Sequence, residues 1–272
     1  MRFAEVVVRI GSYAGICFLM AACSASKATN PDADTIYFSG QIDAASVARF
    51  VQVLRSPSAE GARWIEITSA GGDAPAGFAM GHLIHDRGLS VRVKGYCVSA
   101  CAQYVFLAGK FKSVEPKSLV LFHNTLGMIE RLHRAAGERE GADAFVPVAK
   151  QETQFLHEIG VDTDLTALAM GGLGPVCITV NKQFAASDLK RYGYGSRVVA
   201  FGVSKQMIEG LAGPVQGYWP TDYPDIFHTL RILPFNRAFT VAWVSGVAIK
   251  SQMRPIAPAL PFCPSMTVPR NR

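Results

Sequence analysis

The sequence predicts an α/β fold with a largely parallel sheet. From residue 35 onward, segments with the residue pattern of strands alternate with segments of helical periodicity. Such alternation is typical of parallel strands joined by helices. The composition agrees, because 49% of the 272 residues are hydrophobic and 18% are charged, as in globular proteins with a sizeable core.

The expected elements follow one another at short intervals. The first strand, 35–40, leads into a helix that Asp43 caps and in which Val47, Phe50 and Leu54 recur at helical spacing. The other expected strands cover 63–69, 89–95 and 118–124, and the other expected helices run from Ala76 to Gly88, over 99–109 and over roughly 127–160. Glycines after the second and third helices are typical of helix ends.

The chain is predicted to have four parts. Residues 1–25 are a signal peptide, 26–34 a polar linker, 35–199 the α/β domain, and 200–272 a C-terminal extension rich in proline and aromatic residues. The apolar run 238–249 within this extension is too short to span a bilayer and is expected to lie in a core or an interface. The sequence assigns no chemistry to the extension.

The N-terminus has the layout of a secretory signal. Arg2 and Arg9 precede an apolar run over 10–22, and small residues surround Cys23. "LMAAC" (19–23) resembles a bacterial lipobox, in which Cys23 would carry a lipid, whereas "CSA" (23–25) offers a rival cleavage site. A retained anchor helix is a further alternative. We expect a periplasmic or envelope-anchored bacterial protein.

Charge and cysteine content narrow the class further. The formal net charge is +6, but no dense block of Lys and Arg indicates nucleic-acid binding. Beyond the signal, Cys97, Cys101, Cys177 and Cys263 give an even number, as expected in an oxidising compartment. Cys97 and Cys101 could form a zinc half-site, a redox pair or a disulfide. If both lie at helical i, i+4 spacing, their Cα atoms are about 6 Å apart, within the range of a disulfide. In an exported protein the disulfide is the favoured alternative.

Three features with catalytic chemistry fall in order along the predicted α/β units. "TSAGGD" (68–73) follows a strand, Ser99 opens a helix after the next strand, and His123 ends the strand after that. Ligands gather at the C-terminal ends of such strands. Consecutive glycines let backbone N–H groups approach a developing oxyanion, and a histidine within reach of a serine can accept its proton.

With these motifs, the stretch from about 36 to 195 resembles the ClpP/crotonase superfamily, most closely the ClpP-like serine peptidases and their exported relatives of the signal-peptide-peptidase and NfeD type. The family's Ser-Pro-Gly-Gly motif corresponds to Ser69-Ala70-Gly71-Gly72, with alanine in place of proline. The resemblance implies repeated β-β-α and βα units, Ser99 as nucleophile, His123 as base, and an oxyanion hole from Gly71, Gly72 and Ala100.

The third triad residue departs from the family pattern. An aspartate is expected a few residues before a helix that closes with Tyr-Gly, and "NKQFAASDLKRYG" places Asn181 there. An asparagine can orient an imidazole but cannot stabilise the imidazolium by charge. Asp188 and Asp162 are the alternatives.

The function predicted is a serine hydrolase acting on peptide or protein substrates, without a cofactor and assembled as a homo-oligomer, as the resemblance implies. A catalytically weak or inactive envelope binding or assembly module is the alternative, and acyl-CoA chemistry of crotonase type fits poorly with export. His82, His85 and Asp86 share a helix face, but a third metal ligand is not evident, so no metal is expected.

Overall fold

The computed structural model describes residues 34–123, 125–135, 137–161, 176–180, 200–221, 225–226, 228–229 and 239–244. For 176–180 and 239–244 the description is limited to the backbone. All of these residues belong to one compact unit, Pro31–Arg272.

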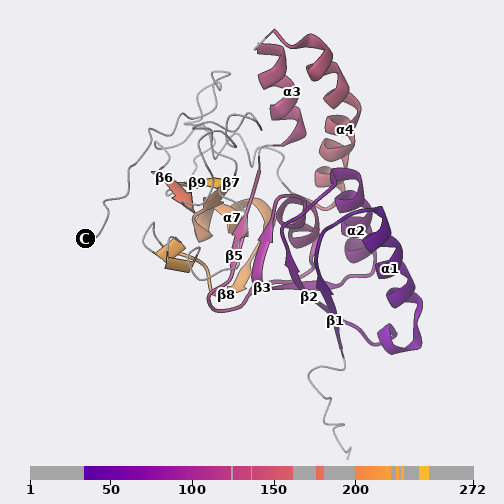
Figure 1. The fold of residues 1–272 in the computed structure, drawn as a ribbon. Coiled ribbons are helices and arrows are strands. Elements are labelled where there is room, and N and C mark those ends of the chain that lie inside the picture. The colour runs from indigo at the N-terminus through magenta and orange to yellow at the C-terminus, as the bar shows by residue number, and fades with distance from the viewer. Residues whose placement is uncertain are drawn as a thin grey trace, which may run out of the picture. The chain divides into compact units, whose positions relative to one another are not determined.

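Strands and helices alternate through the first half of the described chain (Figure 1). The strands are β1 (Thr35–Ser39), β2 (Trp64–Ser69), β3 (Ser90–Val98), β4 (Lys112–Val114), β5 (Leu119–Leu121), β6 (Val176–Val180), β7 (Ala200–Val203), β8 (Val215–Gly217) and β9 (Phe239–Val244). The α-helices are α1 (Ala44–Arg55), α2 (Ala74–Asp86), α3 (Leu126–Ala135), α4 (Arg139–Glu158) and α7 (Lys205–Ala212). A 3₁₀-helix, η1 (Pro57–Ala59), and a π-helix, η2 (Cys101–Phe106), complete the elements.

The main sheet has the order β1-β2-β3-β4-β8, and β5 also pairs with β3. Every pairing in it is parallel. A smaller sheet, β6-β9-β7, contains one antiparallel and one parallel pairing. The prediction of an α/β fold with a largely parallel sheet is therefore confirmed.

An irregularity in β3 allows this strand to pair with two partners on one side. Ile67 lies opposite Val93, whereas Ser69 lies opposite Cys97, so β3 contains two residues more than β2 over this interval. Gly95 has a φ of 79°, a left-handed conformation that favours glycine. Before the irregularity β3 pairs with β4, and after it β3 pairs with β5. The two halves of β3 thus face different neighbours.

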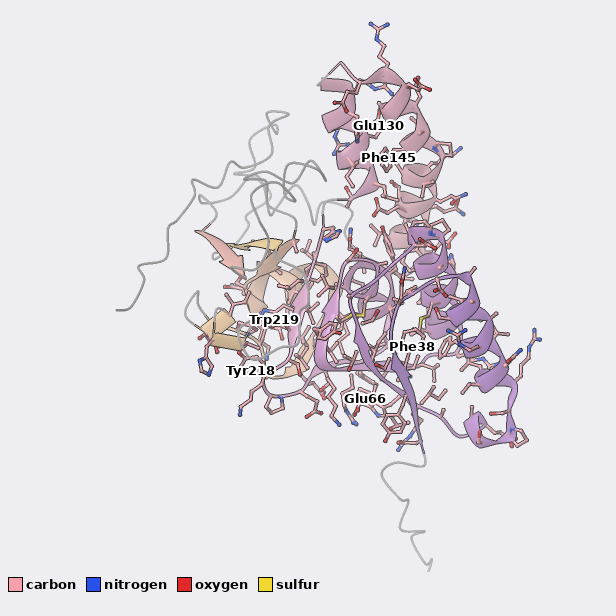
Figure 2. All side chains as sticks on the ribbon, viewed as in Figure 1. Phe38, Glu66, Glu130, Phe145, Tyr218 and Trp219 are labelled. Atoms are coloured by element: carbon pink, nitrogen blue, oxygen red, sulfur yellow. A yellow bond between two sulfur atoms is a disulfide. The ribbon has the colours of Figure 1, made fainter. Side chains whose placement is uncertain are left out.

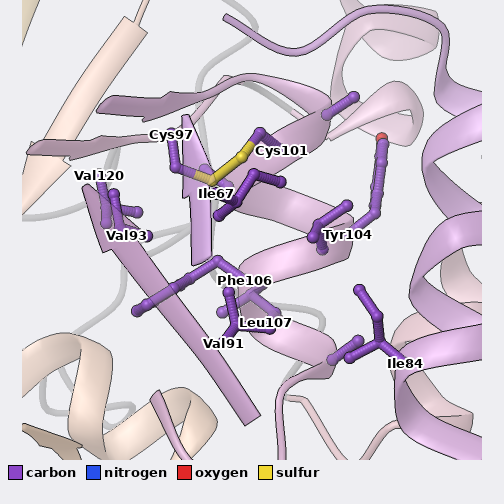
Figure 3. Packing of buried hydrophobic residues seen from close by; sticks show 14 of the residues in the cluster. Ile67, Ile84, Val91, Val93, Cys97, Cys101, Tyr104, Phe106, Leu107 and Val120 are labelled. Atoms are coloured by element: carbon purple, nitrogen blue, oxygen red, sulfur yellow. A yellow bond between two sulfur atoms is a disulfide. The ribbon is translucent and has the colours of Figure 1, made fainter. Parts of the chain in front are cut away.

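The hydrophobic core lies between the sheet and its helices. In β2 the alternate residues Ile65 and Ile67 are fully buried, and from α2 Met80 and Ile84 join the same cluster. Figure 3 shows Ile67 and Ile84 packed with residues of β3 and η2. All six side chains of η2 are buried. The segment that follows Ser99 is therefore fixed inside the core.

The region 127–160, predicted as one helical stretch, is instead a pair of helices. α3 and α4 pack against each other, and Gly137, with a φ of 80°, lies in the turn between them. A left-handed residue ends an α-helix. In Figure 2 the labels Glu130 and Phe145 mark the two helices of this hairpin.

Described residues after position 200 contribute to the same core and sheet as the preceding residues. β8 forms the edge of the main sheet next to β4, and Trp219 and Ile226 belong to the central hydrophobic cluster. The buried Nζ of Lys112 donates to the carbonyl oxygens of Gly109 and Ala212, 2.9 Å from each. Residues 200–221 are thus structurally continuous with the predicted domain. β9, at the start of the apolar run 238–249, pairs with β6 and β7.

Among the helices that the structure describes, none is both long and apolar enough to cross a membrane.

Candidate active site

Ser99 lies at a sharp turn between β3 and the helical segment that begins at Ala100. Its φ is 59°, a left-handed conformation that is uncommon for a residue with a side chain. A nucleophilic serine on a strained strand-to-helix turn is the arrangement of the nucleophile elbow, which exposes the hydroxyl above the sheet. Ser99 is half-buried, so its hydroxyl lies at the boundary between core and solvent.

The parallel register brings His123 to Ser99. Val98, the last residue of β3, lies opposite Leu121, the last residue of β5. The backbone N–H of Ser99 donates to the carbonyl of Leu121 at 3.0 Å. Two residues further on, His123 Nδ1 lies 3.2 Å from Ser99 Oγ. Two residues 24 positions apart are thus joined because their strands end side by side.

The protein surroundings keep His123 neutral. Its side chain is half-buried, and burial lowers the pKa of the imidazole to about 4. A neutral imidazole can accept a proton from Ser99 only through an unprotonated Nδ1, so the ring hydrogen must then lie on Nε2. Within the described part of the chain, Nε2 has no hydrogen-bond partner.

The glycine motif lies directly against the serine. A Cβ on Gly71 would stand 2.8 Å from the Cβ of Ser99 and 2.9 Å from the nitrogen of Ala100. Only glycine allows this approach, because such distances are shorter than real Cβ contacts. Gly71 is therefore in close contact with Ser99 and Ala100.

The N–H groups of the two glycines point in different directions. The Gly71 N–H donates to the hydroxyl of the buried Ser69 at 3.0 Å, so it is already engaged. The Ile42 N–H donates to the carbonyl oxygen of Gly71, and the Ile42 carbonyl oxygen accepts a hydrogen bond from the Asp73 N–H. In a parallel ladder the residue between these two groups directs its own N–H to the opposite side, so Gly72 N–H points away from Ile42. Gly72 and Ala100 are therefore the candidate pair of oxyanion donors.

The predicted disulfide between Cys97 and Cys101 is present. The two Cα atoms are 5.2 Å apart, and both side chains are fully buried. The bond joins the end of β3 to the start of η2 and therefore spans the turn at Ser99. Figure 3 shows it beside Ile67, within the hydrophobic core.

The structure does not describe every residue to which the sequence assigns a role. Asn181, Asp188, Asp162 and Cys23 lie outside the described residues. His82 Nδ1 is 3.7 Å from Glu158, and His85 is 3.4 Å from Asp86. Within the described ranges, no group of three or more His, Cys, Asp or Glu side chains could hold a metal ion.

Two polar residues close to the site were not predicted from the sequence. Glu152 and Tyr104 are buried and hydrogen-bonded to each other. A signal for Glu152 exists in the sequence, because it falls on the helical stripe of Ala149, Phe155 and Leu156, which are buried. A carboxylate on an otherwise apolar face indicates a buried partner.

Comparison with known proteins gives matches among solved structures. No protein-family model matches the chain, and no curated protein is significantly similar to it. Among solved structures, a point mutant of ClpP1 from Listeria monocytogenes is similar at 19% sequence identity and a TM-score of 0.34, covering 47% of this chain and 73% of that chain. A likeness this distant does not extend to activity, so the chemistry must follow from the residues themselves.

Proposed function

We propose that this protein is an exported serine hydrolase that cleaves peptide bonds, with Ser99 as nucleophile and His123 as general base. One observation carries the proposal: Ser99, on a left-handed turn, has its Oγ 3.2 Å from Nδ1 of His123. That distance is within the hydrogen-bond reach that a serine–base pair requires. The peptide class of substrate is supported by the resemblance of the motifs to ClpP-like peptidases.

The proposed reaction uses these groups in a fixed order. Ser99 Oγ attacks the substrate carbonyl carbon while its proton passes to His123 Nδ1. The carbonyl oxygen becomes an oxyanion that the N–H groups of Gly72 and Ala100 stabilise. His123 then protonates the leaving amine, and the C–N bond breaks to leave an acyl ester on Ser99. Water, deprotonated by His123, hydrolyses this ester and returns the serine.

Because Nδ1 faces Ser99, the orienting third residue must accept a hydrogen bond from Nε2. We assign this role to Asn181, with Asp188 and Asp162 as alternatives. An amide oxygen can accept the bond but adds no negative charge beside the imidazolium. The enzyme is therefore expected to be slower than one with a carboxylate in this position.

The proposal includes the setting of the enzyme. The N-terminal pattern of residues 1–25 supports export to the cell envelope, with Cys23 as a lipid attachment site. The disulfide supports an oxidising compartment. Substrates are peptides or proteins, no cofactor takes part, and assembly into a homo-oligomer is expected from the resemblance.

Covalent labelling tests the proposed function. A fluorophosphonate probe should label the folded protein at neutral pH, and peptide mass mapping should locate the probe on Ser99. Ser99→Ala should abolish the labelling. Ser58→Ala is the matched control, because Ser58 is exposed and bonds only with Ser56 among the described residues, and its labelling should equal that of the wild type.

A folded wild-type protein that the probe does not label would overturn the hydrolase proposal and favour an inactive binding or assembly module. Labelling that persists in Ser99→Ala would move the nucleophile to another residue.

A further inference from the structure

The carboxylate of Glu152 is enclosed by three elements. It projects from α4, and only 1% of the residue is exposed. Oε1 accepts a hydrogen bond from the Tyr104 hydroxyl at 2.7 Å, and Oε2 accepts one from the Leu126 N–H at 2.6 Å. The Gly127 N–H also stabilises the charged form. Glu152 thus caps the first turn of α3 while it holds Tyr104 of η2.

Both bonds of Glu152 lead to the proposed catalytic pair. Tyr104 lies five residues after Ser99, on the helical segment that begins directly after the serine. Leu126 lies three residues after His123, where the chain turns from β5 into α3. One carboxylate therefore holds the chain on the C-terminal side of each reacting residue.

Aromatic packing surrounds the same connection. Phe155, one turn after Glu152, contacts Tyr104 edge-on at a ring-centre distance of 5.8 Å and Phe78 of α2 at 5.6 Å. A Cβ on Gly81 would meet Phe155 at 2.5 Å and the Tyr104 carbonyl at 2.6 Å. The elements are packed closely enough that a change in the bonds of Glu152 must move its neighbours.

We propose that Glu152 is a positioning residue for hydrolysis, which sets the distance between Ser99 and His123 through its bonds to Tyr104 and to the N-terminus of α3. This inference rests on the proposed function. The inference goes beyond that function, because Glu152 does not touch the substrate and belongs to no triad pattern.

The role requires the ionised form of Glu152. Burial raises its pKa to about 6, against the opposing effects of the Tyr104 and Leu126 hydrogen bonds. Protonation removes an acceptor, and the Leu126 N–H can only donate. Burial and the neighbouring carboxylate raise the pKa of Tyr104, so its hydroxyl remains a donor. On the other packed elements, His82 of α2 faces Phe155 and Glu158, and Glu130 of α3 bonds with Arg134.

The test compares variants of the full-length protein by the rate of fluorophosphonate labelling from pH 3.5 to 8. Glu152→Gln removes the charge at nearly constant volume, and Tyr104→Phe removes one of the two bonds. Glu158→Gln is the control, because it removes a partly exposed carboxylate from the same helix.

The wild-type rate should fall in two steps as the pH is lowered, near pH 6 when Glu152 is protonated and near pH 4 when His123 is protonated. Glu152→Gln should lack the step near pH 6 and label about 10- to 100-fold more slowly at pH 7.5, since small displacements of reacting groups have effects of this size. Tyr104→Phe should move the upper step to higher pH, because it removes a bond that lowers the pKa of Glu152. Glu158→Gln should retain both steps.

Hydrogen exchange separates failure of this inference from failure of the proposed function. Peptides containing 100–105 and 123–130 should exchange faster in Glu152→Gln than in Glu158→Gln, whether or not the probe labels Ser99. If the wild type labels but Glu152→Gln keeps its rate and its step near pH 6, the inference is wrong and the hydrolase stands. If nothing labels and exchange is also unchanged, both are wrong.

Discussion

At the scale of single residues, the backbone of Ser99 is held in a conformation that its side chain disfavours. A left-handed conformation costs a residue with a Cβ about 1–2 kcal/mol relative to the right-handed one. Its neighbours maintain it: the N–H of Ser99 bonds to Leu121, and the disulfide closes the turn around it. Strain of this kind is concentrated at functional sites.

Replacing Ser99 by glycine should therefore stabilise the fold while it removes the nucleophile. We expect Ser99→Gly to exceed Ser99→Ala in free energy of unfolding by about 1 kcal/mol, because glycine adopts the left-handed conformation freely. Urea denaturation measures the difference. Lys117 is the matched control, since it is exposed and has a φ of 60°.

Lys117→Gly should show a similar gain over Lys117→Ala but leave labelling of Ser99 unchanged. Equal stabilities of Ser99→Gly and Ser99→Ala would mean that the turn is not strained.

The sequence predicted that Ser99 and His123 lie together, but not all of their contacts. Ser99 and His123 could be predicted because each follows a strand, and parallel strands end together. The engagement of Gly71 N–H by Ser69 could not, because it depends on a side-chain rotamer. Glu152 lies 29 residues after His123, and only packing of α4 against η2 reveals its role.

At the scale of elements, the boundary between β3 and η2 is closed by a covalent bond. Cys97 is the last but one residue of β3 and Cys101 is the first residue of the π-helix, so the disulfide spans four positions in sequence. Both sulfur atoms are fully buried. A reductant should therefore reach the bond only when the surrounding core opens.

Replacing both cysteines by serine should lower the free energy of unfolding by about 2 kcal/mol, a modest value because the closed loop is short. Labelling of Ser99 should also slow, since the turn loses its covalent closure. Native protein in dithiothreitol should retain the bond, whereas protein in urea and dithiothreitol should lose it, as thiol counting will show. Rapid reduction of the native protein would contradict the buried position.

The close packing around Gly81 of α2 leads to a second prediction at this scale. Gly81→Ala should destabilise the protein by about 1–3 kcal/mol, because its Cβ would overlap Phe155 and the Tyr104 carbonyl. Gly210→Ala in α7 is the control, since no atom lies within 4 Å of its added Cβ. This control should be stabilised by about 0.5–1 kcal/mol. Thermal unfolding of the two variants measures the contrast.

Element prediction succeeded where the hydrophobic period was long enough to detect. α1 begins directly after its predicted cap, Asp43, and α2 lies within two residues of its predicted bounds. β4 and β8 have three residues each, too few to show an alternating pattern. The division of 127–160 into α3 and α4 depends on a turn at Gly137, where both flanking segments have helical periodicity.

At the scale of the whole molecule, the location in the cell remains a prediction from the N-terminus. Residues 1–30 fused to a reporter that works only outside the cytoplasm should give a signal. Incorporation of labelled palmitate that Cys23→Ser abolishes would establish the lipid-anchored form. An uncleaved cytoplasmic product would contradict export, and with it the compartment expected to form the disulfide.

The position of β8 determines when the main sheet can be completed during synthesis. Its partner β4 ends at Val114, but β8 begins only at Val215, about a hundred residues later in synthesis. Until the later segment emerges, the outer edge of β4 has unpaired backbone groups and Lys112 lacks the Ala212 carbonyl. Such an open edge invites pairing with other chains. A chain that lacks the residues from 215 onward therefore cannot complete its sheet, and the outer edge of β4 stays available for pairing with other chains until β8 occupies it.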